Sequence, residues 1–258
     1  MSSHVLSAAN SWSLWWRKIP VAGHSMRATS LDRLLYLMLH AAGLMGRAER
    51  VFFGSIVQPG MTVVDVGANL GIYTLLFARL VGPKGTVIAF EPEPRLFRAL
   101  RENCAGLSNV RLINAAVGAA AGRGMLMRGS LNSGNNSLLG IDASKGQPNA
   151  GCLVNVVALD QVVNDDVDFI KVDVQGNEWD VFLGMRRLLG RVPLFFEFWP
   201  SGLHRAGTDP AFLVDSLLKA GYRLREVGRD QKGAAVDLPR LVVRLGKHGY
   251  TNLYATPW

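Results

Sequence analysis

Apolar residues along this 258-residue chain follow two periods in turn, one typical of strands and one typical of helices. Between 31 and 57 the helical period predicts one or two helices, and Pro59-Gly60 marks a turn after them. From 61 onward strands and helices are predicted to alternate. The predicted strands cover 61–66, 86–90, 110–114, 124–128, 153–157, 167–172, 193–198, 222–226, 241–244 and 252–255. The predicted helices after the turn cover 70–81, 94–104, 178–189 and 210–220.

Strands that are apolar on both faces and are separated by helices indicate a parallel sheet with helices on both sides. We therefore expect an α/β domain over residues 59–258, preceded by a helical extension over residues 1–58. In a sheet of this kind the ligand lies beyond the carboxyl ends of the strands, where the chain direction switches. Side chains that directly follow a strand are thus the first candidates for a functional site.

The turn after the first of these strands, "DVGANLG" from Asp65 to Gly71, is typical of a nucleotide-binding loop. Its glycines are spaced G-x-x-x-G, whereas a dinucleotide site needs G-x-G-x-x-G and a P-loop needs a lysine after the last glycine. A carboxylate at Asp65 would repel a pyrophosphate and attract a cation. S-adenosyl-L-methionine fits, because it has no phosphate, bears an ammonium and a sulfonium, and has a carboxylate that backbone N–H groups of the turn can bind. The alternative, that Asp65 is a capping or turn residue, stays open.

Glu91 stands at the end of the second strand, in "TVIAFEPEP", twenty positions beyond Gly71. A carboxylate there can accept hydrogen bonds from two ribose hydroxyls. Sites for NAD place an acid similarly, so Glu91 alone does not choose between the cofactors. Together with Asp65 and the glycine spacing, it favours S-adenosyl-L-methionine.

Several stretches in one order carry a resemblance to a known family. They are "VVDVGANLGIYTLLFARLVGPKGTVIAFEPEPRLFRALREN", "NVRLINAAVG", "ALDQV", "VDFIKVDVQGNEWDVFLGM", "LFFEFWP" and "NLYATP". Over roughly residues 59–257 the chain resembles the FkbM-type class I methyltransferases. The resemblance implies a Rossmann-like sheet of seven strands with the last one antiparallel, S-adenosyl-L-methionine as cofactor, and methylation of hydroxyl oxygens. Family acceptors include sugar units of glycolipids and oligosaccharides, and natural products such as macrolides.

The resemblance also assigns individual residues. The positions that match the family's cofactor loop, ribose acid and adenine-flanking segment are Asp65, Gly67, Asn69, Gly71, Glu91, Asn114 and Ala115. The segment "KVDVQGNE" departs from the commoner D-x-E-G-x-E form, because Gln175 replaces an acid. Asp173, Gly176 and Glu178 remain in place, but any scheme that needs a carboxylate at position 175 is weakened.

Methyl transfer to an alcohol needs a group that takes the hydroxyl proton. The candidates at strand ends are Asp173, which is the first choice, and Glu197, with His204 on the segment beyond. Alternatives are that Asp173 caps the following helix, that Glu197 pairs with a buried base, and that His204 is an exposed loop histidine.

A divalent metal such as magnesium is the alternative to a protein base, because it would acidify the acceptor hydroxyl. Asp160, Asp173 and Glu197 supply hard oxygen ligands of the required kind. The five histidines are dispersed and no H-x-x-x-H or Cys/His cluster exists, so a zinc site is not expected. Metal dependence stays open.

The formal charge of +8 is spread over the chain, which favours a solvated basic surface over a nucleic-acid site. "DVQGNE" is also unlike the N-P-P-Y or cysteine motifs of base methylases. Two isolated cysteines and an N-terminus without the pattern of a secretory signal predict a cytoplasmic protein. Trp12, Trp15 and Trp16 beside two basic residues could touch a membrane surface or cover an apolar patch of the protein.

We therefore expect an O-methyltransferase whose acceptor is a saccharide or a glycosylated natural product. The polar segment "RGSLNSGNNSLLG" from Arg128 and the side chain of Trp199 are suited to a polyhydroxylated acceptor, although the segment also fits a connector. A macrolide or other small molecule is the alternative acceptor, and a non-catalytic cofactor-binding module is the alternative class. An NAD-linked oxidoreductase lacks its glycine triplet here. The role of residues 1–58 and the oligomeric state stay open.

Overall fold

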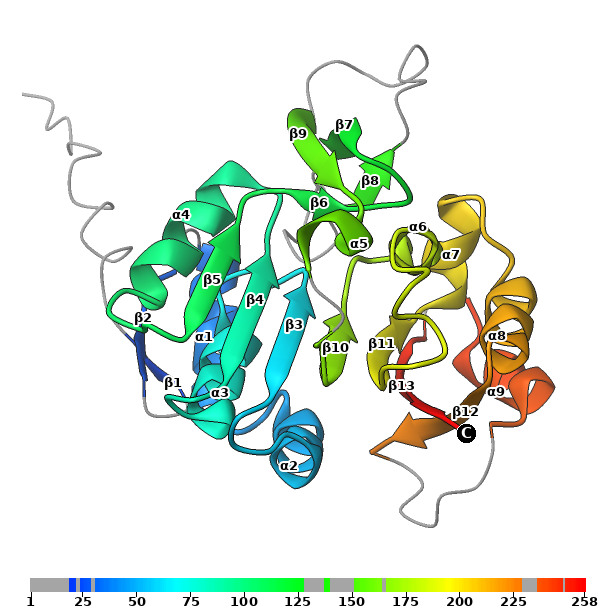
Figure 1. Ribbon diagram of the computed structural model, residues 1–258, viewed down its shortest axis with the longest axis horizontal. Coiled ribbons are helices and arrows are strands. Elements are labelled where there is room, and N and C mark those ends of the chain that lie inside the picture. The colour runs from blue at the N-terminus through cyan, green and yellow to red at the C-terminus, as the bar shows by residue number, and fades with distance from the viewer. Residues whose placement is uncertain are drawn as a thin grey trace, which may run out of the picture.

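A seven-stranded sheet forms the centre of the protein in a computed structural model that describes residues 19–21, 24–28, 31–127, 137–139, 151–163, 166–228, 236–247 and 249–258 (Figure 1). The strand order is β12-β13-β11-β10-β3-β4-β5. The strands are β3 (Thr62–Val66), β4 (Thr86–Phe90), β5 (Val110–Ile113), β10 (Phe169–Val172), β11 (Leu194–Phe198), β12 (Tyr222–Val227) and β13 (Thr251–Pro257). Neighbours from β11 to β5 run parallel, and β13 is antiparallel to both β11 and β12. The α/β fold with seven mostly parallel strands is confirmed.

The chain direction across the sheet reverses between β3 and β10. From β3 the chain steps outward to β4 and β5, and it then returns to β10 on the other side of β3 and continues to β11. In open α/β sheets the crevice for the ligand lies at this switch point, beyond the carboxyl ends of the two strands. The residues after β3 and β10 are therefore those that the topology brings to a ligand.

Helices cover both faces of the sheet. They are α1 (Leu31–Ala41), α2 (Arg47–Ile56), α3 (Ile72–Val81), α4 (Pro94–Asn103), α5 (Leu159–Val162), α6 (Glu178–Leu183), α7 (Pro200–Arg205), α8 (Pro210–Lys219) and α9 (Leu238–Leu245). Because side chains alternate along a strand, Val64 and Val66 pack on the face that α6 and α8 cover. Val63 packs on the opposite face against α2 and α3. Asp65 shares the parity of Val63, so it points into the second layer.

The two helices predicted before the domain are present, and α2 is part of the core. Phe53 on α2 is fully buried, and its ring centre lies 4.9 Å from that of Phe77, 5.9 Å from that of Phe169 and 4.7 Å from that of Phe195. Edge-to-face aromatic contacts of this kind stabilise a layer beyond their buried area. A short hairpin, β1 (Ile19–Val21) with β2 (His24–Met26), precedes α1.

A second, smaller sheet stands beside the carboxyl end of β5. Its strand order is β6-β9-β7-β8. The strands are β6 (Ala116–Val117), β7 (Gly122–Met127), β8 (Ser137–Leu139) and β9 (Gly151–Val157). The strands predicted near 124–128 and 153–157 are β7 and β9, which pair antiparallel. Their pairing into a separate sheet was not predicted, because register between distant short strands leaves no local signal.

Three predicted segments differ from the structure. Residues 241–244, predicted as a strand, belong to α9, which Asp237 caps by accepting a hydrogen bond from the Arg240 N–H at 3.1 Å. The pair Val242-Val243 suggested a strand, but Leu241 is buried and Val243 is 82% exposed, as on an amphipathic helix. The helix predicted over 178–189 ends at Leu183, and turns follow. Residues 200–205 form α7 where a loop was expected.

Candidate active site

A cavity of about 460 Å³ lies at the switch point of the sheet. Its walls include the last residues of β3 and β4, the segment after β10 and the end of β11, together with side chains of α1 and α2. Among the residues that the sequence singled out, those that line it are Gly67, Asn69, Glu91, Ala115, Asp173 and Glu197. The fold thus brings together residues from five separate strand ends.

The glycine turn forms one wall and adopts left-handed backbone conformations. Gly67 has φ 81°, and a Cβ there would collide with the backbone oxygen of Asp173. Glycine is therefore required where the turn approaches the end of β10. Asn69 has φ 55°, a conformation that non-glycine residues adopt at a cost of about 1 kcal/mol. Gly71 begins α3 and packs against Leu100 instead of lining the cavity.

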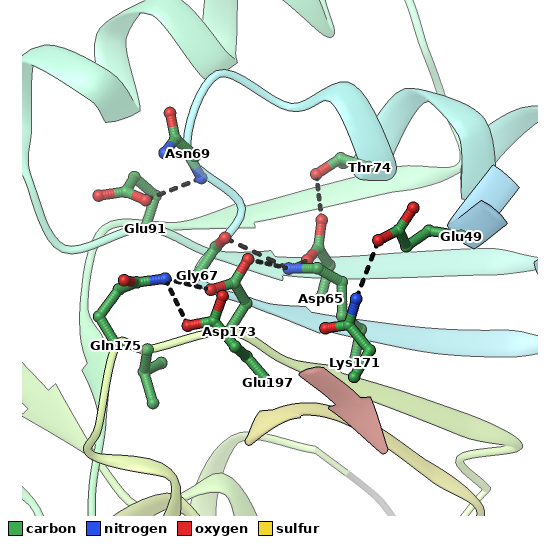
Figure 2. Close-up of polar contacts among 12 residues, drawn as sticks. Glu49, Asp65, Gly67, Asn69, Thr74, Glu91, Lys171, Asp173, Gln175 and Glu197 are labelled. Atoms are coloured by element: carbon green, nitrogen blue, oxygen red, sulfur yellow. Dashed lines mark hydrogen bonds and ion pairs between the residues drawn. The ribbon is translucent and has the colours of Figure 1, made fainter. Parts of the chain in front are cut away.

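Glu91 is held at the end of β4 by backbone groups. Its Oε2 accepts a hydrogen bond from the Asn69 N–H at 2.8 Å (Figure 2). Its Oε1 accepts one from the Glu93 N–H at 2.9 Å. Burial raises the pKa of the Glu91 carboxyl to about 7, although both hydrogen bonds act in the opposite direction. Each carboxylate oxygen has a further lone pair, so the group can still accept two hydroxyls.

The Asn114 side chain does not line the cavity. Its Nδ2 donates to the backbone oxygens of Glu91 at 2.8 Å and Pro92 at 3.1 Å. Asn114, which was predicted to contact the cofactor, thus stabilises the backbone segment that carries Glu91. Ala115, its neighbour, is buried and does line the cavity.

Asp65 lies behind the cavity wall and not in it. Its side chain is fully buried, Oδ2 accepts a hydrogen bond from the Thr74 hydroxyl at 2.7 Å, and Oδ1 pairs with the Lys171 Nζ at 3.0 Å (Figure 2). The sequence-based interpretation had this carboxylate facing the cofactor ammonium. In the structure it faces a lysine of the neighbouring strand, in register with it across the sheet.

Lys171 is a candidate functional residue that the sequence reasoning missed. It is 2% exposed, lines the cavity, and its Nζ lies 3.0 Å from Asp65 Oδ1 and 3.8 Å from Asp173 Oδ2. Burial by itself lowers the pKa of the Lys171 ammonium, but Asp65 and Asp173 outweigh burial and the net shift is upward. A lone cation in the apolar strand "FIKV" is the signal that could have identified it.

Two carboxylates at the ends of β10 and β11 are joined by one amide. The Gln175 Nε2 donates to Asp173 Oδ1 at 2.8 Å and to Glu197 Oε2 at 2.9 Å (Figure 2). Gln175 has φ 58°, which turns its side chain back over the strand ends. Burial raises the pKa of the Glu197 carboxyl well above its ordinary value, and the charge of Asp173 raises it further. The pair therefore holds a proton more tightly than two separate carboxylates would.

The remaining candidates lie elsewhere. His204 is an exposed residue of α7, and Asp160 on α5 accepts a hydrogen bond from the Arg187 N–H at 3.1 Å; neither lines the cavity. The set of Asp160, Asp173 and Glu197 considered for magnesium is therefore not brought together. Throughout the described ranges, no three His, Cys, Asp or Glu side chains lie close enough to hold a metal ion.

Side chains of α1 and α2 form another wall of the cavity. Tyr36 and His40 on α1 have ring centres 4.6 Å apart, and Glu49 on α2 accepts a hydrogen bond from the Asn252 Nδ2 at 2.9 Å. Burial and the nearby Arg50 lower the pKa of His40 to about 4, so its ring is neutral at physiological pH. This wall offers a carboxylate, an amide, phenols and an imidazole.

The other residues predicted to act on the acceptor or on a membrane divide into those that the structure describes and those that it does not. Trp199 does not line the cavity, and the Arg205 guanidinium lies 4.3 Å from the centre of its ring system. Trp12, Trp15 and Trp16, and residues 128–136 and 140 of the polar segment, lie outside the described residues. No helix within the described part of the chain is both long and apolar enough to cross a bilayer.

Comparison with known proteins decides the family. The sequence profile of the FkbM methyltransferase domain matches residues 65–224, which is more than half of the chain. The chain belongs to the FkbM methyltransferase family. This confirms the resemblance seen in the sequence and makes the chain a member of a family of S-adenosylmethionine-dependent methyltransferases.

Two curated members and one solved structure illustrate the family. The 2-O-methyltransferase NoeI of Sinorhizobium fredii is 26% identical over 203 residues, which cover 72% of this chain and 83% of NoeI. The 31-O-demethyl-FK506 methyltransferase FkbM of Streptomyces tacrolimicus is 54% identical over 50 residues, only 19% of each chain. The methyltransferase FkbM structure of Methylobacillus flagellatus aligns with a TM-score of 0.49 and 17% identity, covering 89% of this chain and 56% of that one.

The residues of this FkbM family member fit S-adenosylmethionine and not a pyrophosphate. The N–H groups of the turn are bonded within the protein: those of Gly67 and Ala68 to the Phe90 oxygen, and those of Asn69, Leu70 and Gly71 to nearby oxygens. They are therefore not offered to a phosphate. Glu91 suits the ribose hydroxyls, and the apolar residues suited to the adenine are Phe90, Leu96, Ala115, Val117 and Leu126.

Proposed function

We propose that this chain transfers a methyl group from S-adenosyl-L-methionine to a hydroxyl oxygen of a saccharide. The observation that carries the proposal is the cluster of Asp173, Gln175 and Glu197, which lies in the same cavity as the turn that suits the cofactor. We further propose that residues 59–258 form the catalytic domain and that the preceding extension supplies one wall of its cavity.

The residues divide into a cofactor wall and a reactive cluster. We define the cofactor wall as Gly67, Asn69, Glu91 and Ala115, and the reactive cluster as Lys171, Asp173, Gln175 and Glu197. S-adenosyl-L-methionine, when bound, supplies an electrophilic methyl group on a sulfonium. The cofactor wall binds its ribose and adenine, and the reactive cluster faces the acceptor hydroxyl.

Asp173 is the base in this scheme. The hydroxyl proton of the acceptor would pass to a carboxylate oxygen of Asp173. The oxygen–carbon bond would form as the methyl–sulfur bond of the sulfonium breaks, which would leave S-adenosylhomocysteine as the second product. The Lys171 ammonium lies 3.8 Å from Asp173 Oδ2 and attracts negative charge there, while burial and the charge of Asp173 hold the pKa of Glu197 well above its ordinary value, so that Glu197 retains its proton. Gln175 fixes the separation of the two carboxylates, which aligns the base with the acceptor in a near-attack geometry.

The acceptor wall, defined as Tyr36, His40, Glu49, Tyr73 and Asn252, favours a polyhydroxylated molecule. Carboxylate and amide groups bind several hydroxyls at once, and aromatic rings stack on sugar faces. NoeI is named as a 2-O-methyltransferase, and the Streptomyces relative as a methyltransferase of 31-O-demethyl-FK506. A macrolide or another non-sugar alcohol is therefore the second candidate acceptor for this chain. A non-catalytic module does not account for the reactive cluster, and no nucleic-acid partner is proposed.

A transfer assay tests the proposal. The full chain is incubated with methyl-labelled S-adenosyl-L-methionine and a panel that contains oligosaccharides, glycolipids and macrolide alcohols, and labelled products are identified by mass spectrometry. We expect a methyl ether on a sugar hydroxyl. If only macrolides are labelled, the second candidate acceptor replaces the saccharide. If the protein binds the cofactor but labels no member of the panel, the proposal is contradicted.

A further inference from the structure

A buried cation of α1 lies in the same cavity as the cofactor wall. Arg33 is 3% exposed and lines the cavity with Asn69 and Glu91. Its positive charge acts on Glu91, because it lowers the pKa of that carboxyl against the larger effect of burial. Arg33 precedes the segment that matches the FkbM domain, which begins at residue 65.

The helix fixes the position of this arginine. Arg33, Tyr36 and His40 are spaced i, i+3 and i+7, so they share one face of α1. The Arg33 Cζ lies 5.9 Å from the Tyr36 ring centre, and Leu37 on the adjoining face is fully buried. Packing of α1 against the domain therefore presents the guanidinium to the cavity.

The carboxylate of the cofactor's methionine moiety needs hydrogen-bond donors. The N–H groups of residues 67–71 were the donors expected from the sequence, but each bonds to an oxygen within the turn or at the end of β4, at 2.8 to 3.0 Å. The turn therefore positions the cofactor without neutralising its carboxylate. Another cation must do so, because an anion in a buried cavity is costly without a partner.

Lys171 does not fill this role. Its Nζ is already engaged by Asp65 at 3.0 Å and lies 3.8 Å from Asp173. Arg33 is the other arginine or lysine among the described residues that line the cavity. A guanidinium also matches a carboxylate in shape, since it can donate two parallel hydrogen bonds.

We propose that Arg33 binds the α-carboxylate of the methionine moiety of S-adenosyl-L-methionine, so that α1 completes the cofactor site from outside the matched domain. This rests on the proposed function, because it assumes that the cofactor occupies the cavity. The N-terminal helices are then part of the binding machinery. Loss of the Arg33 charge also raises the pKa of Glu91, so the effect of removing Arg33 is confined to the amino-acid end only at a pH that keeps Glu91 ionised.

Two ligands separate this role from a structural one. S-adenosylhomocysteine carries the carboxylate, whereas 5′-deoxy-5′-methylthioadenosine keeps the adenine, the ribose and a thioether but lacks the amino-acid end. Calorimetry with both ligands is performed at pH 9, well above the pKa of about 7 of Glu91, on the full chain as wild type, Arg33→Gln and Arg33→Lys. The matched control is Arg47→Gln, an exposed arginine at the start of α2 that does not line the cavity.

We expect Arg33→Gln to weaken S-adenosylhomocysteine binding at least tenfold and to change the Kd of methylthioadenosine less than twofold. Arg33→Lys should recover part of the loss, and Arg47→Gln should change neither Kd. An equal loss for both ligands would show a structural role and overturn the inference, as would an unchanged Kd for S-adenosylhomocysteine. Failure of the wild-type protein to bind either ligand would instead overturn the proposed function itself.

Discussion

The cofactor wall and the acceptor wall of the same cavity are built in different ways. The cofactor wall comes from one turn and from residues directly after neighbouring strands, where backbone geometry dictates glycine at position 67. The acceptor wall combines Tyr36 and Glu49 with Asn252, which lies more than 200 positions further along the chain. Glu49 accepts a hydrogen bond from Asn252. In the proposed function, a local motif thus recognises the cofactor, while side chains assembled by the tertiary fold recognise the acceptor.

The reactive cluster lies between these walls, and Lys171 connects two carboxylates with different roles. Asp65 is fully buried and also accepts a hydrogen bond from Thr74, whereas the Asp173 side chain is 35% exposed and lines the cavity. The Lys171 ammonium therefore has one buried partner, Asp65, and one partner on the cavity surface, Asp173, which is the proposed base. Four predictions test this division.

The largest effect is expected from Asp173→Asn. We expect kcat to fall at least 100-fold, because the amide cannot take the acceptor proton, while the Kd of S-adenosylhomocysteine changes less than twofold. The measurement combines labelled-methyl turnover with calorimetry. Asp160→Asn, which lies outside the cavity, is the control; an unchanged kcat for Asp173→Asn would remove this residue as the base.

Glu91→Gln tests the opposite wall and should act on binding. We expect the Kd of S-adenosylhomocysteine to rise about tenfold, because an amide accepts fewer hydrogen bonds than a carboxylate from the ribose. The pKa of Glu91 is about 7, so wild-type affinity should fall as the pH drops below 7 and the carboxylate takes a proton. Calorimetry between pH 6 and 8 should show this trend in the wild type and not in Glu91→Gln. A pH-independent wild-type Kd would contradict the role of Glu91.

Gln175→Glu should shift the pH dependence of turnover. A third negative charge beside Asp173 and Glu197 raises the proton affinity of the pair, and the base works only when ionised. We expect the midpoint of the rise of kcat with pH to move upward by about one unit, with activity recovered at high pH. Gln175→Met, which adds no charge, should lower kcat at every pH without that shift. Identical pH profiles of kcat for wild type and Gln175→Glu would contradict the proposed role of Gln175 between the two carboxylates.

The smallest effect concerns stability. The buried Glu178 accepts hydrogen bonds through Oε1 from the backbone of Val174 and Gly176, and burial raises its pKa to about 7. Because the folded state binds this proton more tightly than the unfolded state, the group's stabilising contribution is greatest below about pH 4.5 and is lost as the pH rises through 7. The side chain of Glu178→Gln cannot ionise. The Tm of the variant minus the Tm of the wild type should therefore rise by a few degrees between pH 5 and pH 8. A constant difference measured by differential scanning calorimetry would contradict this.

The sequence was most informative where function depends on contiguous residues. The strand over 86–90 has the predicted bounds, and the G-x-x-x-G turn lies against Glu91 as the cofactor hypothesis requires. The roles of Asp65 and Asn114 were predicted less well, because position after a strand does not reveal which direction a side chain faces. Asp65 turns away from the ligand since its neighbour in register is Lys171, and register is a property of the assembled sheet.

The acceptor wall shows the limit of sequence reasoning more clearly. Arg33, Tyr36 and His40 share one face of α1, but the sequence alone did not single them out, because their contact with the cavity depends on how α1 packs against the domain. In the same way, nothing local indicated that Gln175 would bridge Asp173 and Glu197. In the sequence, Gln175 only weakened any scheme that needs a carboxylate at position 175. In the structure, its amide donates hydrogen bonds to both carboxylates.

The most direct test of the central claim is calorimetry of the wild-type chain with S-adenosylhomocysteine and, separately, with NADH. The account predicts one S-adenosylhomocysteine site per chain, because Glu91 and the apolar pocket suit its nucleoside, and no NADH binding, because the turn offers no N–H group to a pyrophosphate. Binding of NADH without binding of S-adenosylhomocysteine would contradict the account.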